Sequence, residues 1–265
     1  MKKVTALLTA LLVSGAASAH TLWVVPSHYV LSKENSWIAV DASAANMTFV
    51  PDKGIGLSNL SVHLPDGKQQ AVKDVYQGKR KSMADVQLGG EGTYRIELSN
   101  PLRYFTSYEV DGERKRLMAN KEERKSQLPA GASKVETTQM RSRSFAYVTV
   151  NKPTDTVVKL TGQGLEINSN VHPADFVAEE TITLVFNLDG KPQAGVKGTL
   201  SVDGELYRNE AGRVDFTTDK SGAFTFTPEV AGRYLIEAAY SADTSSKLAD
   251  KVRESVTFTF EVALP

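Results

Sequence analysis

The stretch Glu254-Ser255-Val256-Thr257-Phe258-Thr259-Phe260-Glu261-Val262 alternates polar and apolar residues with a period of two. Such alternation is typical of a β-strand that buries one face and exposes the other. Similar short stretches recur about every ten residues, and Gly, Pro, Asp and Asn separate them. They cover residues 36–40, 60–64, 93–98, 144–150, 181–186, 196–202, 213–217, 223–227 and 232–238. The pattern predicts an all-β fold of the β-sandwich type.

The first of two interruptions in this pattern separates the two halves of the chain. Pro153 and the segment Gly162-Gln163-Gly164 interrupt it near residues 152–165, where we place a domain boundary. We therefore expect an N-terminal β-sandwich over residues 20–155. A C-terminal β-sandwich, immunoglobulin-like or transthyretin-like, is expected over residues 163–265.

The second interruption is a charged insertion, residues 111–142, within the N-terminal unit. It is poor in β-branched residues, which strands favour, so it does not continue the strand pattern. Glu and Lys or Arg neighbours in residues 117–125 predict a short helix there, which Pro129 ends. We interpret the insertion as a solvated excursion between strands; the alternative is a mobile cap or a partner-docking element.

The N-terminus has the pattern of a secretory signal peptide. Lys2 and Lys3 precede a short apolar run over residues 4–13, and Ala17-Ser18-Ala19 fits the small-residue cleavage site. Because the run is too short to span a bilayer, we expect cleavage rather than anchoring. The mature protein is predicted to be periplasmic and to begin at His20.

Composition excludes several classes of protein. The chain has 31 basic and 31 acidic side chains, so nothing indicates a nucleic-acid partner. No second segment suggests membrane insertion. Because the chain has no cysteine, thiol catalysis and thiolate metal sites are excluded. Nucleophile-elbow, zinc-protease and phosphate-loop motifs are also missing from the sequence.

The four histidines are the remaining candidates for metal chemistry. After cleavage, the α-amino group and imidazole of His20 would form a bidentate pair suited to nickel, cobalt, copper or zinc. We expect His172, which precedes Pro173 near the domain boundary, or His28 to complete the site. His63 alternates with Val62 and Leu64 and is expected to point to solvent.

The opening His20-Thr21-Leu22-Trp23-Val24-Val25-Pro26-Ser27 resembles the mature start of a bacterial family of periplasmic proteins of unknown function. Residues 164–196 and 218–234 are similar to that family's second half. The family is labelled a periplasmic component of cobalt or nickel transport. The resemblance implies metal binding through His20, with an envelope transporter component as a partner.

These observations favour a periplasmic protein that binds a divalent transition-metal ion and takes part in nickel or cobalt uptake or handling. One alternative is an oxidative enzyme that holds copper in a histidine brace. Another is an envelope scaffold or adhesion module without metal. We expect a binding protein rather than an enzyme.

Overall fold

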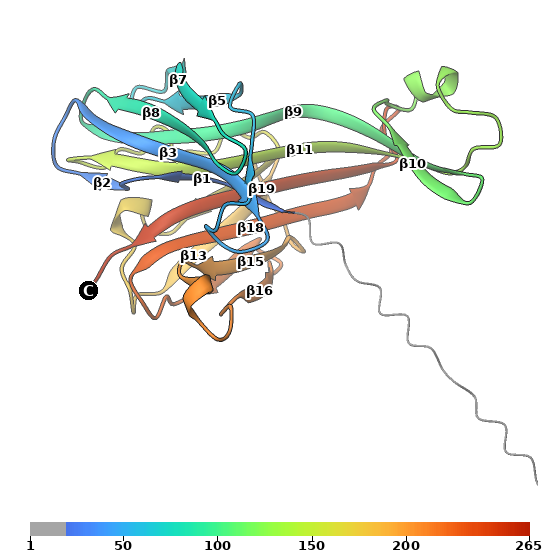
Figure 1. Cartoon of the computed structure of the whole chain (residues 1–265). Helices are drawn as coiled ribbons and strands as arrows, with labels where there is room; N and C mark the ends of the chain where they lie inside the picture. Colours follow the sequence, from blue (N-terminus) through green and yellow to red (C-terminus); the bar gives the residue numbers. More distant parts are fainter. Residues whose placement is uncertain (1–19) are drawn as a thin grey trace, which may run out of the picture.

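The structure is a computed structural model, and it describes residues 20–265. The predicted signal peptide, residues 1–19, lies outside the described residues. The described chain forms three β-sheets and no α-helix (Figure 1). Its helical segments are three short 3-10 turns: η1 (Glu123–Ser126), η2 (Pro173–Asp175) and η3 (Glu205–Tyr207). The predicted all-β class is confirmed.

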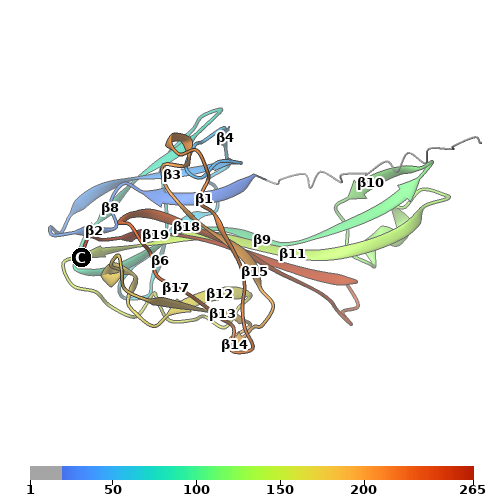
Figure 2. The same ribbon diagram turned by 90° about the horizontal axis from the view of Figure 1, so that it is seen from below.

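The sheets stack as three layers, which Figure 2 shows from below. The first outer sheet comes entirely from the N-terminal half of the chain. Its order is β1 (Thr21–Pro26), β3 (Ser36–Ala45), β8 (Ser82–Leu88) and β7 (Asp74–Gln77), with β4 (Lys53–Gly54) also paired to β3.

The central sheet takes strands from both halves of the chain. Its order is β16 (Val214–Thr217), β15 (Lys197–Val202), β18 (Gly232–Asp243), β19 (Lys251–Val262), β11 (Ser133–Val150), β9 (Gly92–Val110), β5 (Leu60–His63) and β6 (Gln69–Ala71). Two further strands pair outside this order: β10 (Glu113–Leu117) with β9, and β2 (Val30–Leu31) with β11.

The second outer sheet belongs to the C-terminal half. Its strands are β12 (Leu165–Ser169), β13 (Ile182–Leu188), β14 (Lys191–Pro192) and β17 (Ala223–Phe226). The predicted boundary at residues 152–165 falls between β11 and β12. Strand positions follow the alternating stretches of the sequence closely, and β19 contains the whole of the stretch that closes the chain.

Strand β11 serves both sandwiches, because successive side chains of a strand point to opposite faces. Phe145 and Tyr147 lie in the core beneath the second outer sheet. Val148 and Val150 lie in the core beneath the first outer sheet. The sandwich prediction is therefore confirmed, and the structure adds that the two sandwiches share their central sheet.

The junction within the central sheet is a parallel pairing of β11 with β19, from Thr138↔Lys251 to Ala146↔Thr259. These partners are more than a hundred residues apart in the chain. Parallel pairing requires a long crossover connection, and the rest of the C-terminal half, from β12 to β18, supplies it. The halves are thus joined by a backbone ladder as well as by a covalent link.

The charged insertion is not helical, and this corrects our prediction for residues 117–125. Leu117 ends β10, and only the four-residue η1 turn follows. The Thr106 hydroxyl donates to the Ala119 carbonyl at 2.9 Å, which ties that residue to β9, and the Asn120 side chain accepts the backbone N–H of Glu122 at 2.8 Å, so the helical turn begins only after Asn120. The segment also has no apolar face that could stabilise a helix.

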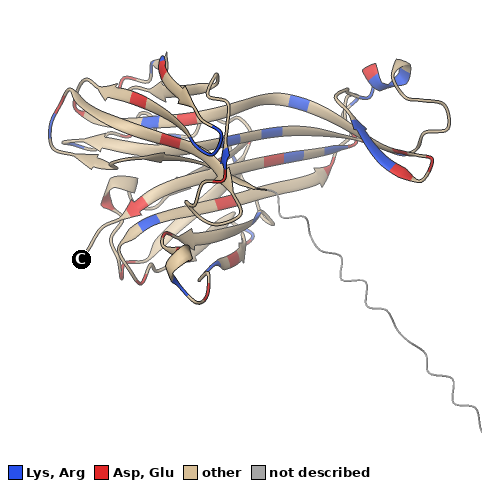
Figure 3. Cartoon of the chain, in the orientation of Figure 1, with Lys and Arg blue, Asp and Glu red and all other residues tan. Residues whose placement is uncertain are grey.

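Residues 113–117 and 133–142 of the insertion instead belong to strands β10 and β11. Strands β9, β10 and β11 run beyond both cores and form an arm with the adjoining ends of β18 and β19 (Figure 1). Both β10 and η1 carry basic and acidic side chains (Figure 3). Ion pairs such as Lys134–Glu109 and Lys251–Glu136, both 2.7 Å, link the strands of this arm.

Candidate metal-binding site at His20

His20 lies immediately before β1, at the start of the described chain. The antiparallel register places Thr21 opposite Ala45, at the end of β3. Trp23, Val24 and Val25 of β1 are buried, so packing of this strand fixes the position of the residue before it. The His20 side chain itself is 43% exposed, which leaves it accessible to a metal ion from solvent.

Asp52 lies beside the His20 ring. Its backbone N–H donates to the Ala44 carbonyl at 3.4 Å, and Lys53, the next residue, pairs with Ala44 as part of β4. The carboxylate Oδ1 lies 3.2 Å from Nε2 of His20. A carboxylate in this position orients the imidazole and holds the proton on Nε2.

This orientation leaves Nδ1 as the ring nitrogen with a lone pair. In a first residue, Nδ1 and the α-amino nitrogen are separated by Cα, Cβ and Cγ, so a metal bound by both closes a six-membered ring. A histidine that ligates a metal ordinarily donates its other ring N–H to a carboxylate or carbonyl. The Asp52 contact therefore matches what a chelate at His20 requires.

A second carboxylate contacts Thr21, the residue after His20. The Thr21 hydroxyl donates to Oε2 of Glu237, an exposed residue of β18, at 2.5 Å. Thr21 and Glu237 both line a small cavity of about 40 Å³, together with residues that include Met47 and Arg213. Glu237 brings an anionic oxygen from the central sheet to the N-terminal strand, where a cation would be attracted.

The neighbouring Glu205 has a structural role. It accepts the Thr48 backbone N–H at 2.8 Å and pairs with Arg213 at 2.8 Å. Burial raises the pKa of the Glu205 carboxyl, but the Arg213 and Thr48 hydrogen bonds outweigh it, so that the pKa is lower than usual. Glu205 thus ties η3 to the loop after β3.

Comparison with protein families identifies the family of the chain. The sequence profile of the domain of unknown function DUF4198 matches residues 17–242. The chain belongs to the DUF4198 family. The family's description assigns no function, so the nickel or cobalt handling that the resemblance implies stays a prediction. No curated protein matches this DUF4198 chain.

Several solved structures are similar to the DUF4198 chain at low identity. The D0–D1 domain of intimin is 12% identical with a TM-score of 0.22, covering 89% of this chain and 95% of that one. The FN1–FN3 domains of chicken CNTN1 are 8% identical with a TM-score of 0.24, covering 92% and 100%. A DUF4785 protein from Legionella pneumophila is 9% identical with a TM-score of 0.25, covering 82% and 50%. These values support no inference about function.

The other predicted ligands lie away from His20. His28 follows the opposite end of β1, and its Nδ1 is 3.0 Å from the Ser27 hydroxyl. A strand rises about 3.3 Å per residue, so the six residues of β1 alone place His28 roughly 20 Å from His20. The two histidines cannot ligate one ion in this fold.

His172 lies at the same end of the molecule as His28. Its Nε2 is 3.2 Å from the Thr93 hydroxyl, which in turn contacts the Thr149 hydroxyl at 3.0 Å. Thr149 donates its backbone N–H to the carbonyl of Tyr29, the residue after His28. The other ring nitrogen, Nδ1, accepts the Ala174 N–H and caps η2.

His63 does not point fully to solvent as expected. It is half-buried on β5, opposite Arg95 of β9. Burial lowers the pKa of the His63 imidazole, and the nearby Arg95 lowers it further, while Glu97 acts in the opposite direction. The ring belongs to a charged cluster inside the C-terminal sandwich rather than to the His20 site.

Within residues 20–265, no three side chains of His, Asp or Glu form a group that could hold a metal ion. Any site at His20 therefore needs the α-amino group as a ligand. The same residues contain no helix long and apolar enough to cross a membrane.

Sequence reasoning missed Asp52 and Glu237. Asp52 stands in the turn-like segment Pro51-Asp52-Lys53-Gly54, and Glu237 is an outward-facing residue of an ordinary alternating strand. Neither position carries a local signal of metal binding. Only the pairing of β4 with β3, and the crossing of β1 over the central sheet, bring them to the N-terminus.

Proposed function

We propose that the mature protein binds a divalent transition-metal ion of the nickel or cobalt type in the periplasm, through His20. The observation that carries the proposal is the contact of 3.2 Å between Nε2 of His20 and Oδ1 of Asp52. That contact leaves Nδ1 to chelate together with the α-amino nitrogen that signal cleavage would free.

The ligand set follows from the neighbours of His20. The α-amino nitrogen and Nδ1 supply two nitrogen ligands, and the Glu237 carboxylate, which accepts from the hydroxyl of the next residue, Thr21, adds negative charge nearby. Imidazole and amine nitrogens suit nickel, cobalt, copper and zinc. Few protein ligands and a half-exposed ring leave coordination positions open, which suits transfer of the ion to a transporter component.

The carboxylate beside His20 favours a binding role over a copper-dependent oxidative enzyme. A histidine brace requires a second imidazole at the metal, and the side chain that contacts the His20 ring is the carboxylate of Asp52. Tight copper binding alone would not indicate a copper protein, since the Irving–Williams order favours copper at nitrogen sites generally.

The experiment is isothermal titration of nickel, cobalt, copper and zinc into protein purified from the periplasm, with native mass spectrometry to identify its first residue. His20→Ala should weaken binding of every ion by at least about 10-fold. His63→Ala, the matched control, should leave the affinities unchanged. Equal binding by His20→Ala and the wild type would refute the proposal and favour the scaffold alternative.

A further inference from the structure

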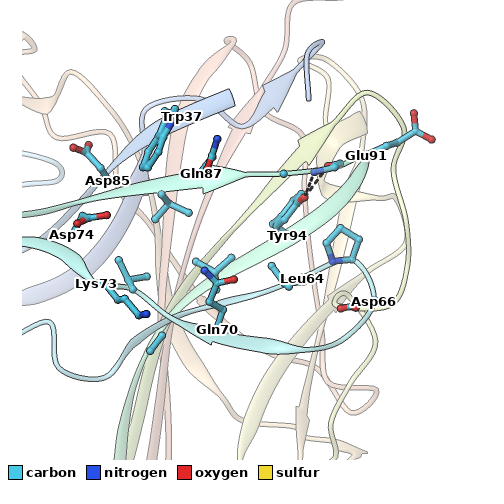
Figure 4. Close-up of a pocket in the computed structure, with 17 residues that line it drawn as sticks. Trp37, Leu64, Asp66, Gln70, Lys73, Asp74, Asp85, Gln87, Glu91 and Tyr94 are labelled. Carbon is cyan, nitrogen blue, oxygen red and sulfur yellow. Dashed lines mark hydrogen bonds between the residues drawn. The ribbon is translucent and has the colours of Figure 1, made fainter. Parts of the chain in front are cut away.

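The N-terminal sandwich contains a cavity of about 590 Å³ at the end opposite to the arm. It opens between β8 of the first outer sheet and the β5–β6 hairpin of the central sheet (Figure 4). Apolar side chains of the core form part of its lining: Val62, Leu64, Val72, Val86 and Tyr94. A cavity of this size with apolar walls and polar groups at its rim is typical of a ligand site.

One wall of the cavity is an unpaired strand edge. Strand β7 covers β8 only from Ser82 to Asp85, leaving the edge free beyond Asp85. Gly78 donates its N–H to the Lys81 carbonyl at 2.9 Å, which identifies the hydrogen-bonded pairs of this ladder. Because such pairs recur at every second residue, the backbone N–H and C=O of Gln87 point to the free edge.

The residues that precede β7 in the chain do not pair with this free edge. Val72, which would continue β7 opposite Gln87, donates its N–H to the Leu60 carbonyl at 3.4 Å. In the described residues, Gln87 therefore presents a donor and an acceptor to the cavity. An incoming strand could satisfy both by continuing the line of β7.

The outer rim of the cavity is acidic. Asp74 and Asp85 stand directly opposite each other in the β7–β8 register, an arrangement of like charges that costs stability. Glu91 also lines the cavity, and Lys73 is the rim's nearby cation. Asp66 is neutralised by Lys68 at 2.7 Å. A bound cation would relieve the repulsion between Asp74 and Asp85.

An exposed indole completes the rim. Trp37 pairs with Gln87 across the β3–β8 ladder and is 57% exposed. Because β8 alternates, Val86 faces the apolar interior while Asp85 and Gln87 face outward beside Trp37. A strand added here would meet apolar walls on one face, and carboxylates with an aromatic ring on the other.

We propose that this cavity binds an extended peptide of alternating apolar and basic residues, which adds to the first outer sheet along the free edge of β8 at Gln87. The apolar side chains enter the cavity against Val62 and Val86. The basic side chains lie over Asp74 and Asp85 and against the face of Trp37. Backbone hydrogen bonds hold the peptide, and the two faces select its sequence.

The test uses the complete mature protein, kept metal-free with a chelator, and a capped peptide of alternating valine and lysine about seven residues long. Its control is the matching valine–glutamate peptide. Of the two tryptophans, Trp23 is buried and Trp37 exposed, so fluorescence emission reports on the site. The lysine peptide should shift the emission to shorter wavelength, and the glutamate peptide should not.

Two variants separate binding from folding. Gln87→Pro removes a donor that no strand uses, a position where an edge strand accepts proline, and should weaken the lysine peptide about 5-fold or more. Asp74→Asn with Asp85→Asn should weaken it similarly and reduce its salt dependence. Asp111→Asn with Glu113→Gln, on the arm, is the control and should change nothing.

The proposal fails if both peptides bind equally, or if both cavity variants bind the lysine peptide like the wild type. It also fails if the lysine peptide gives no shift, including the case in which only a small molecule such as a disaccharide shifts the emission.

Discussion

The imidazole of His20 and the carboxylate of Asp52 lie 3.2 Å apart at the N-terminal end of β1, although 32 positions separate them in the sequence. This contact orients the ring of the residue that signal cleavage is predicted to place first. It leaves Nδ1, the nitrogen that can chelate together with the α-amine, directed away from the carboxylate.

Asp52→Asn should weaken metal binding about 10- to 100-fold, because without the carboxylate the imidazole ring is free to rotate away from the chelating geometry. The fold should be unaffected, since Asp52 is partly exposed. Isothermal titration with nickel measures the affinity. Asp111→Asn, at the distant β9–β10 turn, is the matched control; equal losses in the two variants would remove Asp52 from the site.

His172→Ala should lower stability rather than metal affinity. Its Nδ1 accepts the Ala174 N–H at 3.1 Å and its Nε2 contacts Thr93, so loss of the ring removes a helix cap and a buried contact. We expect a cost of about 0.5–2 kcal/mol in urea unfolding. A loss of nickel affinity with unchanged stability would instead identify His172 as a ligand.

A buried ion pair in the C-terminal sandwich should be sensitive to loss of one partner. Arg95 and Glu97 are 2.7 Å apart, with side chains only 7% and 10% exposed, and Arg95 also stacks on the Phe145 ring. Glu97→Gln should cost about 3–5 kcal/mol, because it leaves an uncompensated buried guanidinium.

The double variant Arg95→Met, Glu97→Leu removes both charges and should recover most of that loss. Glu97→Gln should also lower the pKa of His63 further, because Glu97 counteracts the effect of burial there. Chemical denaturation and NMR titration measure the two effects. A double variant no more stable than Glu97→Gln would contradict this interpretation.

Asp250 stabilises the arm, and this stabilisation depends on pH. Burial raises the pKa of its carboxyl, but hydrogen bonds from Lys121, the Thr137 N–H and Arg124 outweigh this and lower the pKa from 3.8 to about 2. Because the folded-state pKa is below the unfolded one, the stabilisation is present above pH 4 and is lost as the pH falls toward 2.

Asp250→Asn should therefore cost about 1–2 kcal/mol at neutral pH, allowing for partial exposure, and much less near pH 2. Urea unfolding at both pH values measures the difference. A cost independent of pH would show that the carboxylate charge is not what holds the arm.

The sequence predicts the strands well and their assembly poorly. Alternation is local, so a strand such as β19 is visible from its own residues. The parallel pairing of β11 with β19 depends on contacts more than a hundred residues apart, and no local pattern reports it. The helix predicted at residues 117–125 does not form for a similar reason: the hydroxyl of Thr106, which lies in β9, donates a hydrogen bond to the Ala119 carbonyl.

The candidate site was predictable only at His20, whose importance follows from its position after the predicted signal peptide. Asp52 and Glu237 carry no local signal in the sequence; the pairing of β4 brings Asp52 to His20, and the layering of the sheets brings Glu237 to Thr21. His28 and His172 were reasonable candidates by residue type, but the length of β1 separates them from His20.

The most direct test adds one alanine before His20 in the mature protein and measures nickel binding by isothermal titration. The addition keeps every histidine and carboxylate but moves the free amine away from the ring. The chelate account predicts that affinity falls at least about 10-fold, to the level of His20→Ala. Binding equal to that of the native N-terminus would show that the α-amine is not a ligand and would contradict the account.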